Sequence, residues 1–492
     1  MFKKIVLISM ALAMHSTAIF GAECVTASNA QVCCGQMIFE PESITDVQQI
    51  ITDAVAMNKK VRAVAALHGS VDAVCVPEAQ DDDLWLVKTE KLNRILEIDL
   101  ENKTVTLEAG VPLFYLGREM AKHGLEPIAF PGAYDITIGG MVANAVHGTG
   151  RKGSYVDTVL EVTLVDGQGN IVVISDTSNP QWLPAVRCCM GLLGFIYSVK
   201  ISLNPQINRD LISGLSNVQS ILPAVDELLD NNQGFQFQWN PYTLNDVNLS
   251  TTQALNFTND CKTNNIVRDY GKYAGASFIN GELGQINPAP PQFLFPVITD
   301  AIVSGLVGPP GVEFFYKASP NFHDQQTPSV IMELSIPKEQ LESAVEKTRN
   351  IADGLGVADL VFFIFNETRF VQDEKFFAYL SPYNNFNRPN GSWNMGIITI
   401  GPRPVFANDD PNVETEDAIN ADLRNFYETW YDMMVADCDA RPVWSNNPMF
   451  LTFAELNTMY GAANVTAFNA VRTTLDPNDV FLTPYWADRL TP

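Results

Sequence analysis

Positively charged side chains are scarce in this chain. Its 492 residues include 31 Lys and Arg against 56 Asp and Glu, which gives a formal net charge of −25 at pH 7. Such a surface repels the phosphates of nucleic acids and the anionic lipids of membranes. We therefore exclude nucleic acid as a partner and interpret the acidity as a source of solubility.

Metal-binding and redox motifs are also lacking. The chain has five His and eight Cys, and no spacing among them is typical of a zinc site. The adjacent pairs Cys33-Cys34 and Cys188-Cys189 do not have the C-x-x-C redox spacing. We therefore expect no metal.

Apolar runs long enough to cross a membrane are missing after the first 22 residues. Residues 1–22 begin with Lys3 and Lys4, continue with an apolar stretch and end in small residues, which is typical of a secretory signal. The apolar stretch is too short to span a bilayer securely, and an uncleaved anchor is the alternative. The sequence thus predicts an exported protein, periplasmic or secreted, without stable membrane insertion. In that setting the even number of cysteines permits disulfides whose pairing stays open.

The common nucleotide-binding motifs do not occur either. Neither the P-loop spacing nor a G-x-G-x-x-G that opens a βαβ unit is found. Instead, the chain has a glycine-rich stretch at residues 137–173 that contains Gly139-Gly140 and, after His147, Gly148 and Gly150. Glycines let backbone amides approach a flat or phosphate-bearing ligand, because no Cβ stands in the way. We interpret residues 138–150 as a ligand-holding loop with one imidazole near its end.

Several blocks, in their order along the chain, resemble the vanillyl-alcohol-oxidase type of FAD-binding domain (PCMH-type), and within that superfamily the sugar-1,4-lactone oxidases. The blocks are residues 91–99, 104–110, 137–173, 191–196 and 476–485. The resemblance implies FAD as cofactor and an α+β fold. This fold has a two-subdomain FAD-binding domain, a mixed-sheet substrate (cap) domain and a C-terminal segment that returns to the flavin. The chain is also too long for one core. We predict a signal peptide at 1–22, the FAD-binding domain at 23–205, the substrate (cap) domain at 206–425 and the C-terminal segment at 426–492.

The resemblance also assigns the flavin contacts. His68 and Cys75 keep the seven-residue spacing of family members that bind FAD covalently, which implies a bond from His68 to FAD; a loop histidine beside the cofactor is the alternative. His147 is placed near the flavin, and its alternative is a histidine that only fixes the turn. The implied cofactor-binding residues are His68, Gly69, Ser70, Thr137, Gly139, Gly140, Asn144, His147, Gly148, Thr149, Gly150, Gly194 and Ile196.

Glu367 and Arg369 end a strand-like run at 361–370. Residues i and i+2 of a strand face the same side, so the carboxylate and the guanidinium project together. Such a pair can hold a polyhydroxylated substrate and stabilise developing negative charge. In the family this pair is assigned to catalysis: Glu367 would bind or deprotonate a substrate hydroxyl, and Arg369 would stabilise the anionic oxygen or the reduced flavin. The alternative is a structural ion pair.

Residues 441–447 depart from the family pattern. Where relatives commonly read Arg-Pro-His-Trp-Gly-Lys, this chain has Val443, Ser445 and Asn446 at the histidine, glycine and lysine positions. An amide cannot supply the positive charge of a lysine. The prediction is still an FAD-dependent oxidoreductase that oxidises an aldono-1,4-lactone, such as a gulono-, galactono- or arabinono-lactone, by hydride transfer to flavin N5. An alditol or other alcohol oxidase and a secreted non-catalytic flavin- or sugar-binding protein remain as alternatives.

The electron acceptor, oxygen or another compound, is left open by the motifs. Val146 immediately precedes His147, where the family places a gate beside the flavin. A branched side chain there predicts a slow reaction with oxygen.

Local patterns also predict elements that can be compared with the fold. They are a helix capped by Ser43 with Asp46, a hairpin of 92–99 with 104–110, a helix 113–123 closed by Gly124, strands at 329–336 and 361–370, a helix at 338–353 and a helix-rich end from 421. Residues 208–310 give weak periodicity.

Overall fold

The computed structural model describes most of the chain, and every structural statement below concerns these residues. They are 24–26, 32–34, 37–69, 73–74, 83–129, 131, 135–207, 209–216, 218–232, 234–239, 241, 250–256, 311–313, 329–354, 363–384, 388–400, 413–446 and 450–492. The predicted signal peptide, Ser70 and Cys75 lie outside them.

The N-terminal part contains a small parallel sheet of β3 (Met37–Phe39), β5 (Leu84–Lys88) and β4 (Lys60–Val64), in that order. It follows the short pair β1 (Cys24–Thr26) and β2 (Val32–Cys34). Helix α2 (Ile44–Met57) starts at the predicted capping box: Ser43 Oγ accepts from Asp46 N at 3.2 Å, and Asp46 Oδ2 accepts from Ser43 N at 2.9 Å. This local prediction is confirmed.

A second, antiparallel sheet completes the N-terminal half. Its order is β10 (Ile171–Ser175), β9 (Val159–Val165), β11 (Phe195–Ser202), β7 (Thr104–Glu108) and β6 (Ile95–Asp99). The predicted hairpin is the β6–β7 pair, and α3 (Leu113–Ala121) ends before Gly124, which has a left-handed φ of 69°. Shorter elements are β8 (Leu125–Glu126), paired with β12 (Asn204–Pro205), η2 (Tyr155–Thr158), η3 (Pro180–Trp182) and α5 (Leu183–Val186).

One local interpretation was wrong. The start of the glycine-rich stretch is not a loop but a short helix, α4 (Ile138–Ala143). Two consecutive glycines disfavour a helix, but the Gly139 N–H donates to Ala109 O at 2.8 Å, and Ile138 and Met141 are fully buried. Tertiary packing therefore overrides the local preference.

The second half of the molecule is built on one large antiparallel sheet. Alongside it, α10 and α11 contact each other and β17, and α7 contacts β14. The strand order is β16 (Gly311–Glu313), β13 (Arg209–Ser216), β15 (Ser250–Asn256), β14 (Gly234–Trp239), β18 (Phe363–Val371), β19 (Ser392–Ile400), β17 (Ser329–Pro337) and β20 (Arg441–Pro442). The helical elements are α6 (Val218–Ile221), η4 (Leu222–Ala224), α7 (Val225–Asn231), η8 (Lys338–Gln340), α10 (Leu341–Gly354) and α11 (Val413–Cys438).

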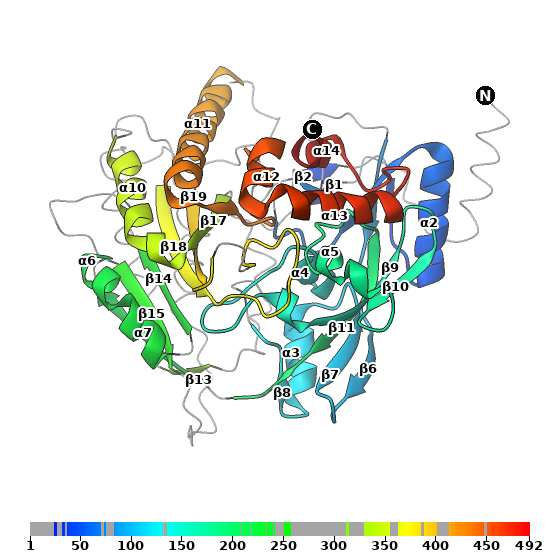
Figure 1. The fold of residues 1–492 in the computed structure, drawn as a ribbon, viewed down its shortest axis with the longest axis horizontal. Coiled ribbons are helices and arrows are strands. Elements are labelled where there is room, and N and C mark those ends of the chain that lie inside the picture. The colour runs from blue at the N-terminus through cyan, green and yellow to red at the C-terminus, as the bar shows by residue number, and fades with distance from the viewer. Residues whose placement is uncertain are drawn as a thin grey trace.

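The C-terminal helices return across the molecule to the N-terminal half (Figure 1). They are α12 (Phe453–Tyr460), α13 (Ala462–Leu475) and α14 (Pro484–Leu490). Backbone hydrogen bonds join Val61 N to Val480 O and Gly167 N to Leu475 O, both at 2.8 Å, and Trp486 Nε1 donates to Ala73 O at 2.9 Å. The α+β prediction is confirmed, and the C-terminal segment contacts the N-terminal half through Val61, Ala73 and Gly167.

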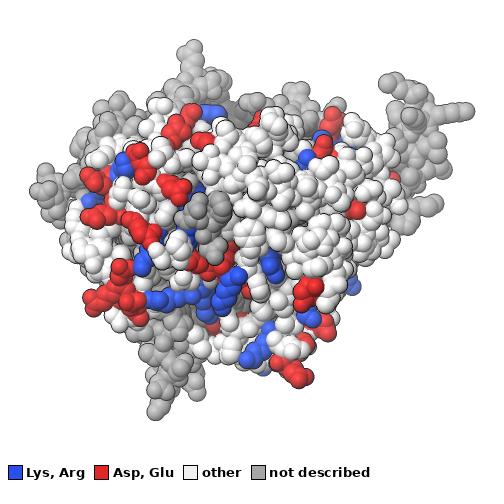
Figure 2. Space-filling model, viewed as in Figure 1, with Lys and Arg blue, Asp and Glu red and all other residues white. Residues whose placement is uncertain are grey.

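Charged side chains are unevenly distributed on the face seen in Figure 2. They gather on the side of α7 and α10, whereas the region of α12 and α13 is mostly uncharged. Among the described helices, none combines the length and the apolar character needed to cross a membrane. Within the same residues, no group of His, Cys, Asp and Glu side chains is arranged to hold a metal ion.

Candidate active site

The segment after α4 connects the two halves of the molecule. The Gly150 N–H donates to Phe370 O on β18 at 2.7 Å, and Thr149 Oγ1 donates to Phe235 O on β14 at 2.5 Å. Gly150 has φ 117°, a backbone conformation that strongly favours glycine. These bonds fix the position of His147 against the large sheet.

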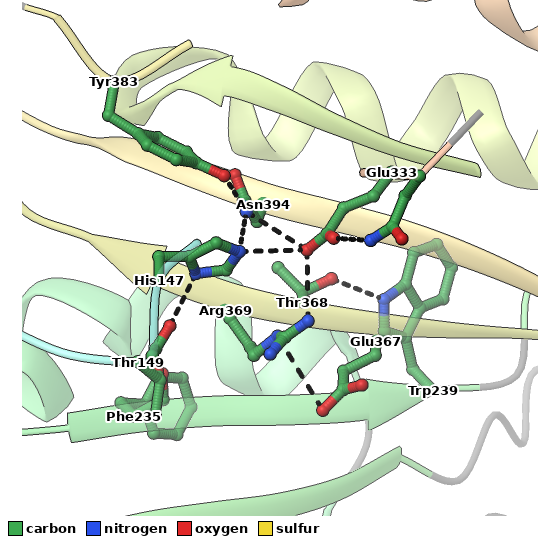
Figure 3. Close-up of polar contacts among 12 residues, drawn as sticks. His147, Thr149, Phe235, Trp239, Glu333, Glu367, Thr368, Arg369, Tyr383 and Asn394 are labelled. Atoms are coloured by element: carbon green, nitrogen blue, oxygen red, sulfur yellow. Dashed lines mark hydrogen bonds and ion pairs between the residues drawn. The ribbon is translucent and has the colours of Figure 1, made fainter. Parts of the chain in front are cut away.

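A buried polar cluster surrounds His147 and is centred on Glu333 of β17 (Figure 3). Glu333 Oε1 lies 3.3 Å from His147 Nε2 and accepts from Arg369 NH2 and Asn394 Nδ2, each at 3.1 Å. Its other oxygen accepts from Asn446 Nδ2. We call Glu333, His147, Arg369, Asn394 and Asn446 the Glu333 cluster.

The cluster keeps Glu333 ionised. Burial alone would raise the pKa of this carboxyl, but the charge of Arg369 and the hydrogen bond with His147 lower the pKa to about 2. Burial opposes the charge on Arg369, while Glu367 and Glu333 outweigh it, so the pKa of Arg369 is raised. The site thus holds a fixed ion pair at neutral pH.

Tyr383 extends the cluster beside the imidazole. Its hydroxyl oxygen lies 2.6 Å from Asn394 Nδ2, and its ring centroid is 5.1 Å from that of His147. Burial raises its pKa well above the ordinary value, so the phenol stays protonated. His147 Nδ1 lies 2.6 Å from Gly148 O, which requires a proton on Nδ1.

Glu367 and Arg369 lie on one side of β18, as the i, i+2 spacing predicted. Arg369 Nε is 3.9 Å from Glu367 Oε1, and both side chains are partly exposed, at 14% and 15%. The intervening Thr368 points the other way, where its Oγ1 accepts from Trp239 Nε1 at 3.0 Å. Because Glu333 is only 4% exposed, the cluster opens towards solvent at Glu367 and Arg369. Their catalytic roles stay predictions.

His68 approaches the same region from the N-terminal half. His68 Nε2 lies 2.6 Å from Asp135 Oδ1, with side-chain exposures of 16% and 7%. A Cβ on Gly69 would lie 2.9 Å from the Ser445 carbonyl oxygen, so the His68 segment packs against the backbone next to Asn446.

The residues around α4 fit a large ligand with polar groups. Thr137 Oγ1 is buried with no hydrogen-bond partner in the part of the chain that the structure describes. A Cβ on Gly140 would have only that oxygen nearby, at 3.6 Å, which leaves room on this side. The N–H groups of Gly148 and Thr149 likewise donate to no acceptor among the described residues. Unused donors and an unused hydroxyl beside a glycine opening suit the polar groups of FAD.

The other predicted flavin contacts have internal partners. Asn144 Nδ2 donates to Gly140 O at 2.9 Å and so closes α4. A Cβ on Gly139 would lie 2.8 Å from Ala109 Cβ, and one on Gly194 would lie 2.7 Å from Val165 O. Ile196 pairs with Leu164 in the β11–β9 ladder. Close packing alone accounts for glycine at 139 and 194, and contact with FAD at these positions stays a prediction.

Sequence reasoning missed Glu333, Asn394, Tyr383 and Asp135 as site residues. Glu333 had a usable signal, since it is the single charge in the otherwise uncharged strand Ser329–Pro337. Asn394, Tyr383 and Asp135 have no local signal, because their partners in the site lie far away in the sequence.

Comparisons with known proteins find a matching domain family and a similar fold. Residues 35–175 match the FAD binding domain family. The fold is similar to that of cholesterol oxidase from B. sterolicum, with a TM-score of 0.75 at 15% identity over 96% of this chain and 98% of that one. The chain therefore carries an FAD binding domain within a flavoenzyme fold of the vanillyl-alcohol-oxidase type, as the resemblance implied.

Its sequence relatives are sugar-lactone oxidoreductases. L-gulonolactone oxidase of Bos taurus is 32% identical over 214 residues, which are 43% of this chain and 47% of that protein. The match thus spans about half the length of this relative. L-gulono-1,4-lactone dehydrogenase of Mycobacterium tuberculosis is 24% identical over 92% of this chain and 96% of that protein. The family resemblance is confirmed, with FAD as the cofactor.

Proposed function

We propose that this protein is an FAD-dependent oxidoreductase that oxidises a secondary alcohol of an aldono-1,4-lactone. The observation that carries the proposal is the convergence of two halves: the His147–Gly150 segment of the FAD-binding half meets the Glu367–Arg369 pair of the large sheet. The names of the relatives, which are lactone oxidases and dehydrogenases, support the lactone as substrate class.

The residues have separate tasks in this proposal. When bound, FAD supplies the acceptor for the hydride that leaves the alcohol carbon. A base must take the hydroxyl proton at the same time, and Glu367 is our candidate because it is partly exposed and beside Arg369. Glu333 is less suited, because it is buried and its ion pair with Arg369 lowers its pKa. Arg369 donates to the developing alkoxide oxygen, and Glu333 keeps its guanidinium in place.

Two substitutions on β18 test these tasks. Removing a positioned charge that acts in the transition state costs about 10²–10³ in rate. Arg369→Ala should therefore slow anaerobic flavin reduction by that amount while the bound flavin content stays normal. Glu367→Gln keeps the shape and should also slow reduction. If instead both variants melt at lower temperature and reduce at the wild-type rate per bound flavin, the pair is only structural.

We further propose that His68 bonds covalently to FAD and that the protein is exported. The close contact of His68 with Asp135 supports the first proposal, because a carboxylate can hold an imidazole in one orientation and accept its proton. The lysines and apolar run of residues 1–22 support the second. Amino-terminal sequencing of the protein in the cell, periplasm and medium fractions of its host tests export: protein found only inside the cell, with residue 1 intact, would contradict it.

A further inference from the structure

The segment that follows β18 is tied to the FAD-binding half by backbone hydrogen bonds, and we call its residues 372–382 the docking segment. Two of its consecutive N–H groups donate to Asp157 Oδ1 at 2.6 and 2.9 Å. A third donates to Pro184 O at 2.9 Å. Since Asp157 lies in η2 and Pro184 in α5, these bonds join the two halves of the molecule. The three donors belong to Lys375, Phe376 and Tyr379.

Glu374 is buried in the middle of this contact. Its Oε1 accepts from the hydroxyl groups of Ser154, on the FAD-binding half, and of Ser381, on the docking segment. Each serine oxygen also accepts a backbone N–H, from Val156 at 3.1 Å and from Tyr383 at 3.3 Å, so its own hydrogen is directed to Glu374. Glu374 Oε2 is buried and has no partner among the described residues. One carboxyl group thus joins both sides while one of its oxygens stays unsatisfied.

The charges beside Glu374 compensate an ionised carboxylate poorly. Asp157 carries a second acid, which disfavours a charge on Glu374. Arg187 favours that charge, but its Nε and NH2 donate to Val159 O at 3.3 and 3.1 Å. Its guanidinium carbon also lies 4.2 Å from the centroid of the Phe376 ring. This arginine is therefore held by the backbone and by an aromatic ring.

Four more titratable side chains interact electrostatically with Glu374. Burial raises the pKa of Cys188, Tyr383 and Tyr460, so the thiol and the two phenols stay neutral. Arg441 is charged, but its NH1 donates to a side-chain amide oxygen at 2.9 Å. Burial therefore outweighs the opposing contributions and raises the pKa of Glu374 to about 8.

We propose that Glu374 is a pH-sensitive switch: loss of its proton releases the docking segment from the FAD-binding half while both halves stay folded. An ionised carboxylate with an unsatisfied buried oxygen is costly, and release of the segment exposes this oxygen to water. The segment begins directly after β18, which carries Arg369, and it ends next to Tyr383. Its release therefore loosens the support of two residues of the candidate site.

The pH range follows from proton binding. A released Glu374 has the ordinary pKa of 4.5, and the docked one has a pKa of about 8. Between these values the docked segment keeps a proton that the released segment loses, so docking weakens as the pH rises and changes little above pH 8. From pH 5 to pH 8 the docking equilibrium should weaken by about 10²-fold or more.

Amide hydrogen exchange, followed by mass spectrometry on the flavin-loaded full-length protein, measures docking directly. Exchange at pH 5, 6, 7, 8 and 9 is corrected for the intrinsic pH dependence of amide exchange. Peptides from the docking segment report on the three bridging amides, and peptides from α2 (Ile44–Met57) report on global unfolding. The variants are Glu374→Gln, which cannot ionise, Ser381→Ala, and the matched control Asp157→Asn, which keeps an oxygen for the two backbone donors.

In the wild type, protection of the docking segment should fall by about 10²-fold between pH 5 and 8 and then level off, while α2 stays protected. Glu374→Gln should abolish the fall, and Asp157→Asn should retain it. Ser381→Ala removes a donor that stabilises the carboxylate, so its fall should continue above pH 8; this variant and the wild type suffice if Glu374→Gln folds poorly. Constant protection in the wild type, an equal fall in Glu374→Gln or a parallel fall in α2 would overturn the inference. The measurement needs no substrate, so it stands apart from the proposed oxidoreductase activity.

Discussion

Glu374 gives the sharpest prediction about stability, because it is a buried carboxyl with the opposite pKa shift to Glu333. Burial raises its pKa from 4.5 to about 8, although hydrogen bonds from Ser154 and Ser381 oppose the shift. Ser154 belongs to the N-terminal half and Ser381 to the loop after β18. Glu374 Oε2 has no partner among the described residues. The native state therefore favours the protonated carboxyl.

The sign of the pH dependence follows from proton binding. Between pH 4.5 and 8 the native state holds a proton on Glu374 that the unfolded state has lost, so the free energy of unfolding falls as pH rises. At about 1.36 kcal/mol per pKa unit, the loss between pH 5 and pH 8 is about 3.5 kcal/mol. The pKa of Asp157 is also raised by burial, and it acts in the same direction.

Urea unfolding at pH 5, 6, 7 and 8 measures this loss. Glu374→Gln resembles the protonated carboxyl and cannot ionise. This variant should therefore keep most of the free energy of unfolding, about 3.5 kcal/mol, that the wild type loses between pH 5 and pH 8. The control is Glu333→Gln. In the wild type, the pKa of the Glu333 carboxyl is lowered. The stability that this carboxylate contributes is therefore present above pH 4.5 and is lost only as the pH falls towards 2. This control should lower stability without changing the slope between pH 5 and 8. An unchanged slope in Glu374→Gln would refute the reasoning.

The remaining predictions concern the flavin side of the site. His68→Ala should abolish flavin that stays with acid-precipitated protein, and Asp135→Asn should reduce it; in-gel flavin fluorescence measures both, and full fluorescence in His68→Ala would exclude the bond. Val146→Gly should speed reoxidation of the reduced protein by dissolved oxygen in stopped flow, and fast reoxidation of wild type would remove the argument. Gly139→Ala should lower stability by about 1–3 kcal/mol through overpacking against Ala109; urea unfolding checks it, with an unchanged midpoint as the contrary result.

Sequence reasoning succeeded where the cause was local. The Ser43–Asp46 capping box lies within one turn, and the β6–β7 hairpin joins neighbouring runs. The shared face of Glu367 and Arg369 follows from the period of a strand. In each case the interacting residues are close in the sequence, so the pattern contains the information.

Sequence reasoning failed where distant strands meet. Glu333 reaches Arg369 because β19 lies between β17 and β18 in the sheet, and no spacing in the chain reports this order. The strand β13 (Arg209–Ser216) lies in a region of weak periodicity. Its pairing with β15, and not a local sequence pattern, accounts for the strand. Helix α4 formed against its local preference because Ala109 accepts from Gly139. Two of the five residues of the Glu333 cluster, Glu333 and Asn394, were thus not predicted.

The most direct test of the proposed activity is the visible spectrum of the purified protein under anaerobic conditions. Protein with normal flavin content should show the oxidised flavin bands and lose them on addition of L-gulono-1,4-lactone or D-arabinono-1,4-lactone, with slower loss in Arg369→Ala. A fully loaded protein whose bands persist with every lactone and alditol would contradict the account and leave a flavin-binding protein without turnover.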